Sequence, residues 1–74
     1  MKYVVIELQD LGEQVANLVT AYASVNQAEQ KYHEVLSAAA VSQVPVHSAI
    51  MVNSEGQYIK SEAYDHRQPE SQEE

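Results

Sequence analysis

The stretch NQAEQKYHEVLSAAAV, Asn26 to Val41, decides the fold that the sequence predicts. Asn26 precedes Glu29 by three residues, which is the spacing of a capping box, so we expect a helix to start there. The last turn of this stretch is small and apolar around its whole circumference, which predicts that a second surface packs closely against it. Apolar residues recur every three or four positions and predict one buried side, formed by Ala28, Tyr32, Val35, Leu36 and Ala39.

Two segments before the helix are predicted as strands. Residues 2–9 are apolar on both sides through Val4, Val5 and Ile6, which is typical of a strand inside a sheet. Residues 14–22 are rich in Val, Thr and Tyr, which favours a second strand after a turn at residues 10–13. Their apolar spacing also continues that of the helix backward, so one long helix over 13–42, in a βαββ fold, is the alternative. We favour the strand, because a helix start signal has no purpose inside a continuous helix.

A hairpin is predicted after the helix, which must end before Pro45. Its strands are residues 46–53 and 57–64, and Asn53 to Gly56 has the composition of a type I turn with a left-handed glycine. This turn would place Met51 opposite Ile59. We therefore expect Ala49, Met51, Ile59 and Ala63 under the helix, and Val46, Ile50, Val52, Tyr58 and Tyr64 on the opposite face, with Lys60 and Glu62 between them.

The predicted fold is α+β, with the order ββαββ, a four-stranded, mainly antiparallel sheet and one helix packed on one face. We expect the strand order 2-1-3-4. Residues 1–64 form one small domain, and residues 65–74, which include no aliphatic side chain, are predicted to be an acidic, solvated tail. Because one helix covers only one face, we expect a homodimer or larger homo-oligomer. The predicted interface residues are Ala38, Val41, Val46, Ile50 and Val52.

The charge of the chain restricts its partners. Eleven acidic and 4 basic residues give a formal net charge of −7. Nucleic acid is disfavoured as a partner, because its recognition depends on basic groups that neutralise phosphates. Acidity suits a partner with a basic surface. No signal peptide or membrane span is recognisable, so we expect a cytoplasmic location without a membrane partner.

Several short motifs along the chain suggest a resemblance to a group of other proteins. They are an Ala-Glu-x-Lys-Tyr-His helix start, an Ala-Ala-Ala-Val-Ser helix end, a Val-Pro-Val-His strand start and a Glu-Gly turn, all within Ala28 to Glu62, preceded by YVVIE at Tyr3 to Glu7. In these motifs the chain resembles a group of small uncharacterised proteins of bacteria and their phages. The resemblance implies a compact domain and no particular activity. The turn at Leu11 to Gln14 is shorter than is usual in that group.

No motif predicts catalysis. Gly12 and Gly56 are the only glycines, which leaves no phosphate-binding loop, and the serines lack the context of a nucleophile elbow. We therefore expect no enzymatic activity and no cofactor. Glu29 and His33 have metal-ligand spacing, and His47 could add a third ligand. A helix-stabilising pair is the favoured interpretation, so we predict no metal site, and the absence of cysteine excludes disulfides and thiolate ligands.

Three hypotheses for function remain. The first is an oligomeric binding module that holds a small anionic, nucleotide-like ligand in a pocket at a subunit boundary. The second is an acidic interaction or inhibitor module that binds a basic protein, and the third is an accessory protein that only assembles with itself. The predicted ligand-binding residues are Tyr32, His33, His47, Tyr58, Lys60 and Tyr64.

Overall fold

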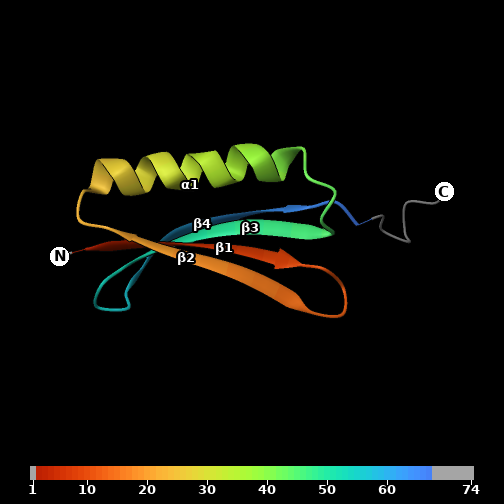
Figure 1. Cartoon of the computed structure of the whole chain (residues 1–74), viewed down its shortest axis with the longest axis horizontal. Helices are drawn as coiled ribbons and strands as arrows, with labels where there is room; N and C mark the ends of the chain where they lie inside the picture. Colours follow the sequence, from red (N-terminus) through yellow and green to blue (C-terminus); the bar gives the residue numbers. More distant parts are fainter. Residues whose placement is uncertain (1, 68–74) are drawn as a thin grey trace.

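A computed structural model describes residues 2–67 of the chain and contains one antiparallel sheet crossed by one helix (Figure 1). The α+β fold and the strand order β2-β1-β3-β4 confirm the prediction. A strand, and not part of a long helix, occupies the ambiguous segment before α1. The elements are β1 Tyr3–Asp10, β2 Val15–Tyr22, α1 Val25–Ala40, β3 Val46–Asn53 and β4 Tyr58–Asp65.

The N-cap of helix α1 lies two residues earlier than the predicted cap. Ser24, not Asn26, is the N-cap: its backbone is extended, and its Oγ accepts a hydrogen bond from the Gln27 N–H at 3.4 Å. Glu29 therefore does not close a capping box. The predicted inward side is confirmed, since all five of its residues are buried. In the last turn Ala39 is buried, but Ala38 is exposed and Val41 is 83% exposed.

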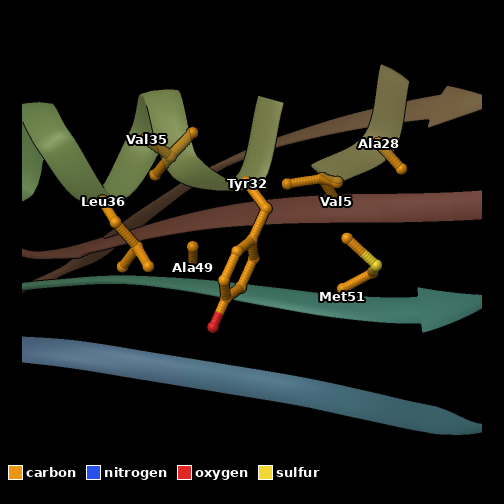
Figure 2. Close-up of a cluster of buried hydrophobic side chains, with 7 residues drawn as sticks. All are labelled: Val5, Ala28, Tyr32, Val35, Leu36, Ala49 and Met51. Carbon is orange, nitrogen blue, oxygen red and sulfur yellow. The ribbon is translucent and has the colours of Figure 1, made fainter. Parts of the chain in front are cut away.

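The core is a single layer of side chains between α1 and the two central strands. Figure 2 shows Tyr32 reaching from the helix across β3 toward β4, with its hydroxyl at the edge of the cluster. Val5 of β1 and Met51 of β3 are the largest fully buried side chains. The small Ala28, Ala39 and Ala49 are fully buried too, which lets the helix approach the sheet closely.

The register of the second hairpin corrects one prediction. Asn53 faces Gln57 as expected, and Gly56 has the predicted positive φ, of 82°. A bulge between Met51 and Val52 then shifts the pairing, so Met51 lies opposite Lys60 instead of Ile59. Because a one-residue shift exchanges the two faces, the inward side of β4 carries Lys60, Glu62 and Tyr64, and the predicted inward residues Ile59 and Ala63 do not lie under the helix.

The C-terminal end of the described residues bears on the predicted domain boundary. β4 ends at Asp65, where the predicted tail begins, and the His66 N–H donates a hydrogen bond to the Pro45 carbonyl oxygen at 2.8 Å. The rest of that tail, from residue 68 onward, lies outside the described residues. Within residues 2–67, α1 is too short and too polar to cross a membrane.

Candidate functional site

The two sides of the sheet differ in cover. We call the side that packs against α1 the inner face and the opposite side the outer face. No other element of residues 2–67 lies on the outer face (Figure 1). Side chains alternate between faces along each strand, and the strand registers then assign every position. The outer face consists of Val4, Ile6, Leu8 and Asp10 of β1, Val15, Asn17, Val19 and Ala21 of β2, Val46, Ser48, Ile50 and Val52 of β3, and Tyr58, Ser61, Ala63 and Asp65 of β4.

Most side chains of the outer face are apolar, and its charged groups lie at one end only. Its two carboxylates, Asp10 and Asp65, lie on either side of Val46, which is opposite both of them. Asp65 is already paired, since Arg67 Nη2 lies 2.8 Å from its Oδ2, and hydrogen bonds from Arg67 lower the pKa of Asp65 to about 2. The centre of this face, around Ile6 and Ile50, contains no charged group.

The outer face is also open to solvent. Val19 of β2 is 55% exposed and Tyr58 of β4 is 65% exposed, whereas the outer side chains of the central strands are half-buried by their neighbours. A contiguous apolar surface across four strands is unusual for a protein that remains a monomer.

The inner face holds a polar cluster near the start of α1. Lys60 Nζ lies 2.6 Å from Glu29 Oε1 and 4.7 Å from the centre of the Tyr32 ring. His33 Nε2 lies 3.3 Å from the same carboxylate oxygen of Glu29, and its ring packs edge-on against Tyr32. The hydrogen bond from Lys60 lowers the pKa of Glu29, while burial raises the pKa of Tyr32. An anion at Lys60 would therefore have to displace Glu29.

A second inner-face cluster joins β1 to β3. His47 Nε2 lies 2.7 Å from Glu7 Oε2, and Gln9 Nε2 donates to the same oxygen at 3.1 Å. Burial alone would raise the pKa of Glu7, but the hydrogen bonds from His47 and Gln9 outweigh it and hold the pKa below its ordinary value. The His47 side chain is only 5% exposed, and its Nδ1 has no hydrogen-bond partner among the described residues.

The predicted ligand-binding residues do not form one site. Tyr32, His33 and Lys60 meet around Glu29. His47 lies opposite Tyr64 on neighbouring strands, and Tyr58 is on the outer face. The three residues of the hypothetical metal site do not come together either. His47 pairs with Glu7 and not with Glu29 and His33, and residues 2–67 contain no cluster of three potential metal ligands.

Two shallow hollows lie next to β2, one along the strand and one between its last residue and α1, and neither is lined by a predicted ligand-binding residue. One, of about 130 Å³, is lined by Glu7, Gln9, Ala16, Asn17 and Leu18. The other, of about 240 Å³, is lined by Tyr22, Gln27, Gln30, Lys31 and Glu34. The polar cluster of Glu7 and Gln9 was missed from the sequence. The sequence does contain a signal for it: Glu7 follows the core residue Val5 by two positions and therefore lies on the same, covered face. A charged residue on a covered face requires a partner.

Comparisons with known proteins add no relative: no family model, no curated protein and no solved structure matches this chain.

Proposed function

We propose that this chain is a non-enzymatic, self-associating module in which two copies pack their outer sheet faces against each other. The observation that carries the proposal is the apolar, uncharged centre of the outer face, which the single helix leaves open. Stacked sheets pack about 10 Å apart, with side chains from both faces filling the space between them. Such a sandwich would enclose the side chains of Ile6 and Ile50 from both copies.

The partner in this proposal is a second copy of the chain, because of where the charges lie. Residues 1–64 carry 7 acidic and 3 basic groups, a net charge of −4, so two copies repel each other over most of their surface. Glu29, Glu34 and Glu62 lie on α1 or the inner side of β4, and the centre of the outer face is free of them. A partner with a basic surface would instead require carboxylates of this chain among the apolar side chains of the outer face, to pair with its basic groups.

The size of the outer face is sufficient for a modest interface. Four strands spaced by about 4.8 Å, each about 26 Å long, cover roughly 500 Å². Two such faces would bury on the order of 1,000 Å² together, which is near the lower limit for a specific interface. We therefore expect an assembly that dissociates on dilution.

A charge placed on the outer face tests the proposal. Ser48 lies on the outer side of the central strand β3, so Ser48→Glu adds a carboxylate there without removing an apolar side chain. Ser37→Glu makes the same change on the exposed side of α1 and is the matched control. In sedimentation equilibrium at micromolar concentration, Ser48→Glu should halve the mass of the assembly, and Ser37→Glu should leave it unchanged. A monomeric parent protein, or an unchanged mass for Ser48→Glu, would refute the proposal.

A further inference from the structure

The two edges of the sheet differ in how they are protected. Edge strands expose unpaired backbone groups, and proteins that remain monomeric protect them with charges, prolines or bulges. The β4 edge has such protection: it carries Lys60, Glu62 and Asp65 and contains the irregular pairing next to Met51. The β2 edge has none. Its sequence VANLVTAY contains no charge and no proline, and its pairing with β1 is regular over eight residues.

The side chains of β2 are also open on both faces. Leu18 on the inner side is 53% exposed, because α1 lies over the central strands, and Val19 on the outer side is 55% exposed. The absence of charge extends beyond the strand, since no charged residue occurs between Glu13 and Glu29. In a chain of net charge −7, this uncharged stretch coincides with the unprotected edge.

The hydrogen-bond pattern shows which backbone groups of β2 are free. Leu11 N–H donates to the Gln14 oxygen at 2.9 Å, so this pair is a hydrogen-bonded one. Hydrogen-bonded pairs alternate along an antiparallel ladder, so the even-numbered residues of β2 bond to β1. A second hydrogen bond supports this assignment: Ser54 N–H donates to the Lys2 oxygen at 2.8 Å. The backbone groups of the even-numbered residues of β1 therefore point toward β3, and those of the odd-numbered residues point toward β2. The outward N–H and C=O groups therefore belong to Val15, Asn17, Val19 and Ala21.

We infer that β2 is a second self-association surface, at which two copies pair their β2 strands antiparallel about a twofold axis through Leu18. This register places Val15 opposite Ala21 and Asn17 opposite Val19, and each pair points to the same face, as a continuous sheet requires. All the outward backbone groups of the four odd-numbered residues find partners. The two Leu18 side chains meet on the inner face, in a pair with no hydrogen bond between its backbones.

The β2–β2 pairing does not depend on the proposed packing of outer faces. The size of the full assembly rests on both surfaces. The edge axis is perpendicular to the sheet, whereas the axis that relates two stacked outer faces lies between and parallel to them. If these two perpendicular twofold axes intersect, they generate a closed set of four copies, two continuous eight-stranded sheets packed back to back. The helices cover the two inner faces of this assembly.

Matched lysine variants separate the two surfaces. Leu18→Lys adds a charge at the β2 edge without touching the outer face, and Ile59→Lys makes a similar change on β4, where the side chain is 40% exposed. By sedimentation equilibrium, the parent should have the mass of four copies. Leu18→Lys and Ser48→Glu should each give two copies, the double variant one copy, and Ile59→Lys four.

The masses distinguish the failure of each surface. If only the outer face associates, the parent has two copies, Leu18→Lys leaves the mass unchanged, and the edge inference is refuted. If only the edge associates, the parent has two copies, Leu18→Lys gives one copy, and Ser48→Glu leaves the mass unchanged, which refutes the proposed function alone. Open-ended growth that Ile59→Lys blocks would show β2 pairing with β4 and would overturn the twofold register.

Cross-linking tests the register itself. The chain has no cysteine, so a single Leu18→Cys variant can form a disulfide only with a second copy. The Cα atoms of a pair without backbone hydrogen bonds are about 4.5 Å apart, within disulfide range. We expect oxidation to give covalent dimers of Leu18→Cys. Val19→Cys should give fewer, because Val19 lies opposite Asn17 and not opposite the Val19 of the second copy, and Ile59→Cys should give none. A yield from Val19→Cys or Ile59→Cys that equals that of Leu18→Cys would refute the register.

Discussion

The inner and outer faces of the same sheet differ in how their side chains are shielded from water. On the inner face, the helix covers a small apolar core, and polar side chains beside it are paired, as Glu7 is with His47 and Glu29 is with Lys60. On the outer face, apolar side chains continue across all four strands with no cover from residues 2–67. The difference teaches that the helix covers one side of the sheet only, and the proposed self-association follows from that difference.

Met51 and Ile50 give the largest test of that difference, because they are neighbours on β3 that point to opposite faces. Met51→Ala removes a fully buried side chain and should cost about 2–5 kcal/mol of unfolding free energy at any protein concentration. Ile50→Ala removes a side chain whose burial would be completed in the proposed assembly, so its cost should increase with concentration. Urea unfolding at low and high micromolar concentration measures both. A cost for Ile50→Ala that does not change with concentration would contradict coverage of the outer face.

Glu7→Gln tests the pairing of polar groups on the inner face and should have a smaller effect. Removing the charged partner of His47 should lower the unfolding free energy at pH 7 by about 1–2 kcal/mol, since Glu7 is partly exposed. The folded-state pKa of Glu7 lies below its ordinary value of 4.5, so its ionisation stabilises the fold above about that pH. This contribution is lost as the pH falls through the folded-state value.

The pH dependence of unfolding provides the matching measurement. The difference in stability between the parent and Glu7→Gln should be largest near pH 7 and should shrink as the pH falls below 4.5. The other carboxylates titrate in both proteins and therefore cancel in the difference. Two stability curves that remain parallel from pH 7 to pH 3 would show that the Glu7–His47 pair contributes no pH-dependent stability.

Ser24→Ala tests the cover of the inner face at the start of α1 and should have the smallest effect. It removes the hydrogen bond from Gln27 N–H to Ser24 Oγ and should cost about 1 kcal/mol. Asn26→Ala is the control, because Asn26 lies inside the first turn and is not the cap. Thermal unfolding of both variants measures the effect, and a larger loss for Asn26→Ala would restore the cap that the sequence predicted.

Much of the inner face could be predicted from the sequence, and its polar pairs could not. The helical spacing of Ala28, Tyr32 and Leu36 follows directly from 3.6 residues per turn, so their burial was correctly predicted. The partner of His47 is Glu7, 40 residues earlier in the chain, and only the register between β1 and β3 brings the two together. The six predicted ligand-binding residues were grouped by residue type alone, and the structure distributes them over two faces.

Local chemistry thus determined the elements of this protein: the order of strands and helix, the inward side of α1 and the left-handed Gly56 all follow from short-range sterics and periodicity. The tertiary structure alone decided the face of each residue in β4, because the bulge beside Met51 depends on how two strands pair. It also decided that α1 lies over the central strands and leaves the side chains of β2 exposed. The predicted strand order already placed the uncharged segment Val15 to Tyr22 at an edge of the sheet, but the position of the helix over the sheet depends on packing between distant residues.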